Sequence, residues 1–452
     1  MTDSADTCDG LDEPAASAPA PDMPPDVPAL KVFYLYLTAG CNLHCRHCWI
    51  TPTFVQGKPV PAECLDLGRL KGAVAEGKPM GLSAAKLTGG EPMLHPQFRE
   101  IADYLSSEGL ELSLETNGTL LDRDLAVHLV RHTTLKRVAV SLDSPVEQEH
   151  DRFRGRPGAF RKAVRGIRFL AEAGLPPQII MSVYRGNLDR IEGLIELAMK
   201  LGASSVKFNP VTHSGRGEEI HRQGLGLDFD GHLALIRRIR GPLQDRYPIH
   251  LGAMVPPAMS MVKELLRYGG EGAGCHVRHI LGILGTGEMA LCGIGRSIPE
   301  LCFGRLGQDR LREVWMTHPV LVRMREELKG PFPGVCGDCL HAGRCMTHCL
   351  AQNYEACGTL VAPSPLCAEA VRRGVFPQSR RKQETGDRRQ RSEVRGPDSE
   401  DGSRTADPGL RVLPPRLRRG RGWRGGAVSG AFDGGEKHPG PSAGDEMPGA
   451  GG

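Results

Sequence analysis

The sequence contains no apolar run that approaches the roughly 20 residues needed to cross a membrane. It also lacks a secretory signal, because its start carries Asp3, Asp6 and Asp9 where a signal peptide has a basic and then an apolar segment. These absences predict a cytoplasmic protein with no membrane partner. Fourteen cysteines in a reducing compartment then favour metal ligation over disulfide bonds.

The body of the chain carries no net charge. The whole chain has 57 Lys and Arg residues and 53 Asp and Glu residues. Residues 379–452 contain 15 of the basic and 11 of the acidic residues, which leaves 42 of each sign before residue 379. A protein that binds a phosphate backbone needs a clustered basic surface, so we expect no nucleic-acid partner. The arginine-rich end has no hydrophobic periodicity, which is typical of a disordered tail.

Short aliphatic runs alternate with helical patterns from residue 31 onwards, which is typical of βα units around a parallel sheet. Six such repeats predict an α/β fold, a partial (β/α)6 TIM-like barrel with functional residues at the carboxyl ends of its strands. The expected strands are Val32–Leu37, Ala85–Thr88, Leu110–Glu115, Arg137–Leu142, Gln178–Val183 and Ser205–Asn209. The expected helices include Gln97–Ser107, Ala159–Ala173 and Leu188–Leu201.

The alternation stops near residue 269, where cysteine density rises. Nine of the fourteen cysteines lie between Cys275 and Cys367. We therefore expect a second, cysteine-rich domain, and two terminal segments too polar to fold. The expected segments are a disordered start (1–29), the barrel (30–268), the small cysteine-rich domain (269–376) and a disordered tail (377–452).

Three cysteines share the loop that follows the first expected strand. Cys41, Cys45 and Cys48 are spaced by four and then three residues. Three thiolates can hold three irons of a cubane cluster and leave its fourth iron open for a small chelating ligand. A structural zinc site would need four ligands in two pairs, and no partner pair lies nearby in the sequence.

This loop resembles the CxxxCxxC hallmark of the radical S-adenosylmethionine (SAM) superfamily, and the resemblance extends over residues 31–217. The second expected strand ends in Thr88 and continues as Gly89, Gly90, Glu91 and Pro92, which matches the family's GGEP motif. The resemblance implies a [4Fe–4S] cluster that cleaves SAM to a 5′-deoxyadenosyl radical, which removes a hydrogen atom from the substrate. Gly89, Gly90 and Glu91 would bind SAM, since two glycines let the backbone approach a ligand closely.

Weaker matches to the same family imply further SAM contacts at the ends of later strands. Asn117 follows the third strand, Ser141 ends the fourth and Arg185 follows the fifth. Each of these residues could instead cap a helix or lie in a loop. Between the cysteines, His47 is expected to pack near the adenine rather than to ligate metal.

Seven later cysteines resemble the SPASM domain, the auxiliary-cluster module of peptide-modifying radical SAM enzymes. By that resemblance a first auxiliary [4Fe–4S] cluster would be held by Cys275, Cys292 and Cys349. A second would be held by Cys336, Cys339, Cys345 and Cys367. The first cluster then lacks a fourth ligand, which either Cys302 or a substrate would supply, while Cys357 competes for a place in the second. A zinc ribbon would explain only Cys336 and Cys339.

The two resemblances together predict a ribosomal-peptide maturase that forms a thioether, a carbon–carbon crosslink or a related product at a C–H bond. A sulfatase-type formylglycine maturase is an alternative, although that group places a catalytic Asp where this chain has Gly293, so Glu288 or another acid would have to serve as the base. A tetrapyrrole-modifying radical SAM enzyme is a further alternative, whose relatives usually carry fewer cysteines. An iron–sulfur electron carrier would explain the cysteines but not the GGEP motif.

The family resemblance also implies partners. We expect a peptide or protein substrate and a reducing partner such as flavodoxin or ferredoxin. Only about 30 residues precede the first strand, too few for a leader-binding winged helix. A separate leader-peptide recognition protein is therefore a further expected partner.

Overall fold

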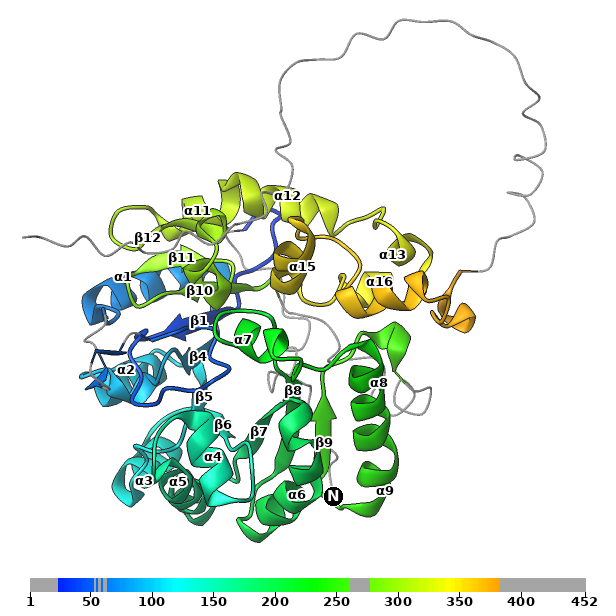
Figure 1. Cartoon of the computed structure of the whole chain (residues 1–452). Coiled ribbons are helices and arrows are strands. Elements are labelled where there is room, and N and C mark those ends of the chain that lie inside the picture. The colour runs from blue at the N-terminus through cyan, green and yellow to red at the C-terminus, as the bar shows by residue number, and fades with distance from the viewer. Residues whose placement is uncertain (1–22, 53, 56–57, 60–62, 261–276, 383–452) are drawn as a thin grey trace, which may run out of the picture. The chain divides into compact units, whose positions relative to one another are not determined.

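A ten-stranded sheet organises the computed structural model, which describes residues 23–52, 54–55, 58–59, 63–260 and 277–382 (Figure 1). Eight of its strands run parallel, seven of them side by side in the order β1-β4-β5-β6-β7-β8-β9. Their bounds are β1 (Val32–Tyr36), β4 (Ala84–Thr88), β5 (Glu111–Thr116), β6 (Leu135–Ser141), β7 (Gln178–Val183), β8 (Ser205–Pro210) and β9 (His250–Ala253). The six strands expected from the sequence are confirmed, with ends that differ by at most two residues.

Helices cover the outer side of the parallel strands (Figure 1). In α5 (Ala159–Ala173), Ala163, Ile167 and Leu170 recur at helical spacing and are fully buried, so this face packs on the sheet. The helix ends at Gly174, whose φ of 101° lies in the left-handed region that favours glycine. The other covering helices are α1 (Leu67–Gly77), α2 (Phe98–Ser107), α3 (Arg123–His132) and α6 (Ile191–Lys200).

The inner side of the strands carries polar and charged residues. In β1, Phe33 and Leu35 are fully buried under the helices, and the alternation along the strand turns Tyr36 to the inner side. On the same side, Lys86 of β4 and Glu115 of β5 form an ion pair with 2.5 Å between Nζ and Oε1. The interior of the barrel is therefore suited to a polar substrate.

Four strands of this sheet were not predicted from the sequence, and neither was the separate two-stranded pair of β2 (Phe54–Val55) and β3 (Lys58–Pro59). β9 extends one edge of the sheet, and β10 (Ile280–Ile283) lies parallel to β1 at the other, with Val32 opposite Ile280. β11 (Glu288–Ala290) and β12 (Cys302–Arg305) follow antiparallel. These strands have three or four residues each, too few for a clear alternation of apolar and polar positions. The strands β10, β11 and β12 thus continue the sheet of the barrel.

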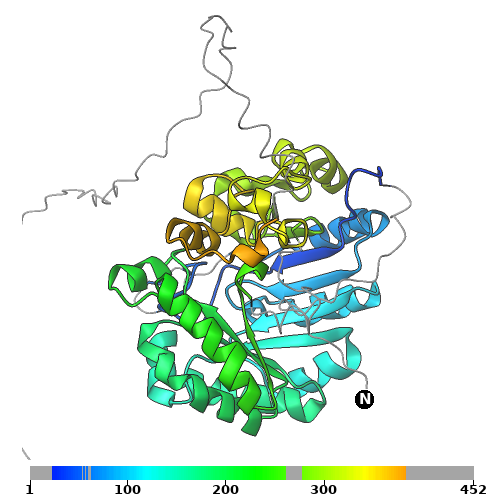
Figure 2. The ribbon, with the colours of Figure 1, turned by 90° about the vertical axis from the view of Figure 1, so that its right-hand side faces the viewer.

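The chain after β12 forms a group of short helices, drawn in yellow-green to orange in Figure 2. They are α11 (Leu311–Thr317), α12 (Pro319–Glu327), α13 (Val335–Asp338), α14 (Ala342–Cys345), α15 (Leu350–Cys357) and α16 (Pro365–Arg372). Trp315 is fully buried and donates from Nε1 to the carbonyl oxygen of Pro28 at 2.9 Å, which ties α11 to the segment before β1. None of the helices within the described ranges is both long enough and apolar enough to cross a membrane.

Candidate functional site

The three cysteines of the first loop pack against one another directly after β1. Cys41 and Cys45 are buried and Cys48 is half-buried. Burial, with smaller contributions from Glu91, Cys45 and Cys48, raises the pKa of Cys41 to about 12. Three sulfurs this close would repel one another as thiolates, so the set suits a cationic group that takes one sulfur on each of several metal atoms, as an iron–sulfur cubane does.

The Gly-Gly turn after β4 lies against the start of the cysteine loop. Gly89 has a φ of 142°, and a Cβ atom on it would lie 2.5 Å from the carbonyl oxygen of Thr38. The N–H of Gly90 donates to the same oxygen at 2.8 Å, and a Cβ on Gly90 would lie 2.1 Å from the carbonyl oxygen of Gly40. Only glycine fits at both positions, so a bare backbone lies next to the cysteines.

Glu91 joins the ends of two neighbouring strands. Its fully buried carboxylate accepts bonds of 2.8 Å from the Thr116 hydroxyl and from the N–H of Asn117. A third, longer bond of 3.4 Å comes from the N–H of Met93. Burial raises the pKa of Glu91 to about 7, against the effect of these donors. Glu91 therefore holds the Gly-Gly turn in place, a role that the sequence motif alone did not indicate.

Asn117 reaches the cysteine loop from the end of β5. Its Nδ2 donates to Oδ1 of Asn42 at 2.9 Å and lies 3.9 Å from the sulfur of Cys41. Its Oδ1 accepts from the Thr119 hydroxyl at 2.6 Å, which fixes the orientation of the amide. The structure thus brings Asn117, Glu91 and the two glycines together around the loop.

Ser141 and Arg185 lie at the ends of β6 and β7. Ser141 is half-buried and stands opposite Ile180 in the sheet. The partly exposed Arg185 pairs with Asp228 at 2.7 Å and donates to the carbonyl oxygen of Gly226. These contacts direct Arg185 toward residues 226–228, and none of them joins it to the cysteine loop.

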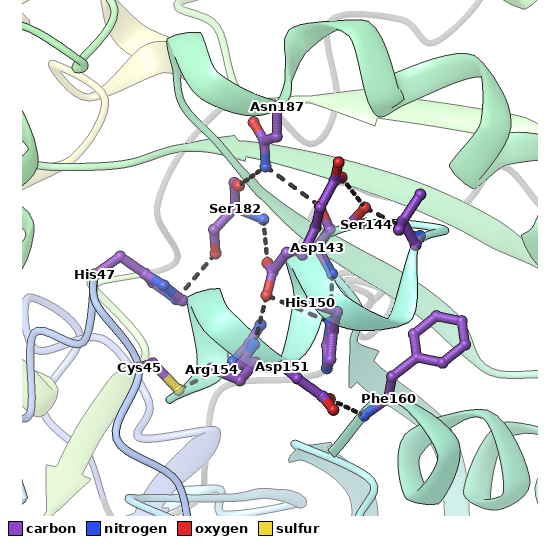
Figure 3. A network of polar contacts seen from close by, with 12 residues as sticks. Cys45, His47, Asp143, Ser144, His150, Asp151, Arg154, Phe160, Ser182 and Asn187 are labelled. Atoms are coloured by element: carbon purple, nitrogen blue, oxygen red, sulfur yellow. Dashed lines mark hydrogen bonds and ion pairs between the residues drawn. The ribbon is translucent and has the colours of Figure 1, made fainter. Parts of the chain in front are cut away.

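A buried polar network connects the cysteine loop to β6 and β7 (Figure 3). Arg154, the last residue of α4 (Glu147–Arg154), donates from Nη1 to the sulfur of Cys45 at 3.6 Å and from Nε to Asp143 at 2.5 Å. Although burial opposes the charge, the Arg154 guanidinium holds the pKa of Asp143 below its ordinary value. The sequence concealed this arginine, because it lies in a run of basic residues that reads as a solvated surface.

His47 belongs to an aromatic stack beside the same network. Its ring lies 4.6 Å from that of Phe153, which in turn lies 5.0 Å from the ring of Tyr184. Its Nε2 bonds the Ser182 hydroxyl at 3.1 Å, and burial lowers the pKa of His47 to about 3. Because the ring stacks on Phe153 and its Nε2 is already bonded to Ser182, it suits packing rather than metal ligation.

Four of the later cysteines line one cavity. They are Cys336, Cys339, Cys345 and Cys367. Burial, together with the charges of Cys336 and Cys339, raises the pKa of both Cys345 and Cys367 to about 12. Within the described ranges, no three His, Cys, Asp or Glu side chains lie close enough to hold a single metal ion. Sulfurs spread around a cavity suit a cubane, which takes one thiolate per iron, better than a single zinc.

Cys292 and Cys349 form a pair that is separate from the four cysteines of the cavity. Burial raises the pKa of Cys292 to about 12, and Cys349 adds to the shift. Cys275 lies outside the described residues. The thiol of Cys302 donates to the carbonyl oxygen of Gly295 at 3.2 Å, and its pKa is raised by burial and by Glu288, with no contribution from Cys292.

Cys357 belongs to neither of these groupings. It is exposed, and its thiol donates to the carbonyl oxygen of Asn353 at 3.1 Å, one turn back in α15. It does not line the four-cysteine cavity.

A different small cavity is lined by Tyr36, Gly89 and Gly293, so it touches both the Gly-Gly turn and the residue after Cys292.

Several known proteins are similar to this chain. A family model described as "Radical SAM superfamily" matches residues 35–198. The AdoMet-dependent heme synthase of Methanosarcina barkeri is 32% identical over 345 residues, which cover 73% of this chain and 94% of that protein. The mycofactocin maturase MftC of Mycobacterium ulcerans is 28% identical over 352 residues, 76% of this chain and 89% of that one. The crystal structure of Streptococcus suis SuiB bound to S-adenosylmethionine has a TM-score of 0.58 at 14% identity, over 76% of this chain and 77% of that one, which confirms the fold.

Proposed function

The chain belongs to the radical SAM superfamily, whose members use SAM and a [4Fe–4S] cluster, and we propose that it is a peptide maturase of that family. When bound, these cofactors supply a carbon radical that removes a hydrogen atom from the substrate. The observation that carries the proposal is the contact between the loop of Cys41, Cys45 and Cys48 and the bare backbone of Gly89 and Gly90.

The residues of the site divide between two tasks in this proposal. Cys41, Cys45 and Cys48 hold the cluster, and the Gly-Gly backbone lets the methionine part of SAM approach it. Glu91 and Asn117 keep the turn and the loop in register through the bonds described above. Ser141 and Arg185 remain candidates for contacts with SAM, as the family resemblance implies.

We further propose that residues 269–376 hold two auxiliary [4Fe–4S] clusters. The cavity lined by Cys336, Cys339, Cys345 and Cys367 supports one of them. The pair Cys292 and Cys349, together with Cys275, is the ligand set proposed for the other. Anaerobically reconstituted protein should then bind about twelve irons, and replacing the four cysteines of the cavity with Ala should leave about eight. Four or fewer irons in the intact protein would refute the assignment.

A peptide substrate is supported by the mycofactocin maturase relative, because the match covers 89% of that protein. A tetrapyrrole is the second candidate, because the heme synthase relative shows the higher identity of the two. Its 345-residue match is longer than the barrel of residues 30–268, so the cysteine-rich region does not by itself distinguish the two substrates. The polar interior around Lys86 and Glu115 suits either one.

Deuterium transfer tests the substrate. The reduced enzyme is incubated with SAM and either a deuterated precursor peptide encoded beside its gene or a deuterated iron tetrapyrrole with carboxylate side chains. We expect deuterium in 5′-deoxyadenosine and a mass change only with the peptide. Transfer from the tetrapyrrole alone would replace the first candidate by the second.

The same proposal includes partners and a location. A flavodoxin or ferredoxin would supply the electron for the cluster, and a separate protein would deliver the leader of the peptide. The cytoplasm is the proposed compartment, since thiolate ligands need a reducing environment.

A further inference from the structure

Arg154 contacts the first loop through both its side chain, at Cys45, and its backbone, at His44. Its Nη1 lies 3.6 Å from the sulfur of Cys45, and its carbonyl oxygen accepts from the N–H of His44 at 3.0 Å. The next residue, Gly155, lies so close that a Cβ on it would be 2.4 Å from the carbonyl oxygen of His44. The end of α4 is therefore fixed against the loop at the cysteine itself.

Asp143 holds the guanidinium from its other side. Its Oδ2 accepts from Nε of Arg154 at 2.5 Å, and its Oδ1 accepts from the N–H of Ser182 at 2.9 Å. Asn187 donates to the carbonyl oxygens of both Asp143 and Ser182, at 3.3 and 3.0 Å. Bonds that do not involve Arg154 thus fix the carboxylate in place, and it can orient the arginine in turn (Figure 3).

The ion pair of Arg154 and Asp143 costs desolvation free energy that a purely structural link between α4 and β6 would not require. The side chains of Arg154 and Asp143 are 7% and 1% exposed, and desolvation of two buried charges can exceed their mutual attraction. Apolar residues of similar volume would join α4 to β6 at less cost. A donor to a cluster sulfur, by contrast, can be supplied only by a polar group at this position.

We propose that Arg154 is a positioning residue for the catalytic cluster: it donates an N–H bond to the Cys45 thiolate and so favours the reduced cluster, while Asp143 orients it and limits its effect. The inference rests on the proposed function, because it takes Cys45 as a cluster ligand. Hydrogen bonds to the sulfurs and nearby charge set the reduction potential of such clusters. Reduction adds one negative charge, which a neighbouring cation stabilises.

The test is the reduction potential of the catalytic cluster in the anaerobic holoenzyme, followed by EPR and identified as the signal that SAM perturbs. Arg154→Gln should lower the potential, since it removes the cation, and Arg154→Lys should restore part of the loss. Asp143→Asn should raise the potential, since it removes the compensating anion while keeping the shape of the side chain. Glu149→Gln is the control, because it alters the bonds of the same helix to Arg190 and Ser144, both at 2.7 Å, and removes no bond of Arg154 or of the Asp143 carboxylate.

Shifts of opposite sign in Arg154→Gln and Asp143→Asn, with Glu149→Gln unchanged, support the proposal. Variants that keep their iron and show no shift, or shifts of the same sign, overturn it and leave a structural ion pair. If Arg154→Gln fails to retain the cluster, Asp143→Asn decides, and an unchanged potential there overturns the proposal. Failure of the proposed function would look different, since no EPR signal would then respond to SAM in any variant.

Discussion

The ring of Tyr36 lies directly against the backbone of Gly293. A Cβ atom on Gly293 would be 2.3 Å from Cζ of Tyr36 and 2.2 Å from Cη2 of Trp49. The residue after Cys292 therefore has no room for a side chain. This packing argues against a formylglycine maturase, which resembles this chain in its cysteines but has a catalytic Asp at that position.

Gly293→Asp should destabilise the protein instead of supplying a base. Overpacking of this kind typically costs about 1–3 kcal/mol, and here the strain falls next to Cys292, so the first auxiliary cluster should also be retained less well. Urea unfolding and iron analysis measure the two effects. Gly72→Asp in α1 is the matched control, because a Cβ there meets nothing within 4 Å. Equal losses in both variants would contradict the packing argument.

Cys302→Ala should leave the iron content unchanged. The Cys302 thiol already donates to the carbonyl oxygen of Gly295 at 3.2 Å, so we expect that it does not complete the first auxiliary cluster. A substrate thiol is then the better candidate for the open iron, and adding a cysteine-bearing peptide should perturb the cluster spectrum. Cys357→Ala is the control. Loss of about four irons in Cys302→Ala alone would show that Cys302 is a ligand.

The iron content of a C-terminally truncated protein should depend on whether residues 379–382 are present. The N–H of Leu340 donates to the carbonyl oxygen of Arg380 at 2.9 Å, and the N–H of Lys382 donates to that of Asp338 at 2.7 Å. These bonds hold residues 380–382 against the backbone on either side of Cys339. A protein ending at Lys382 should keep all its iron, whereas one ending at Gln378 should lose the cluster of the four-cysteine cavity. Identical iron contents would show that these bonds are dispensable.

Strands and cysteine sets were predictable because each depends on residues close together in the sequence. Aliphatic runs such as Gln178–Val183 identified the six expected strands, and spacing grouped Cys336 and Cys339. The four-residue strand β10 gave no comparable signal, because its pairing with β1 depends on residues about 250 positions apart.

The polar contacts that hold the site together could not be predicted from the sequence, for a related reason. Arg154 contacts Cys45 from 109 positions away, and a single arginine among others carries no sign of burial. Glu91 was recognised as part of a motif, but its partners at Thr116 and Asn117 belong to the next strand. Contacts of this kind become visible only once the strands are placed side by side.

Glu91→Gln should change how stability depends on pH. Because the folded pKa of Glu91 is raised from 4.5 to about 7, the wild-type protein keeps the full contribution of this group below pH 4.5 and loses it as the pH rises through 7. The loss amounts to about 3 kcal/mol. The variant should therefore gain stability relative to the wild type between pH 4.5 and 7 in anaerobic urea unfolding. Exposed Glu100→Gln is the control, and parallel pH profiles for all three proteins would contradict the shift.

Cleavage of SAM by the reduced protein tests the central claim most directly. The anaerobic holoenzyme is reduced with dithionite, mixed with SAM, and assayed by chromatography for 5′-deoxyadenosine and methionine. We expect both products from the wild type, and none from a variant in which Cys41, Cys45 and Cys48 are replaced by Ala but the auxiliary irons are retained. Wild-type protein with a full iron content that forms no 5′-deoxyadenosine would contradict the account and favour an electron carrier.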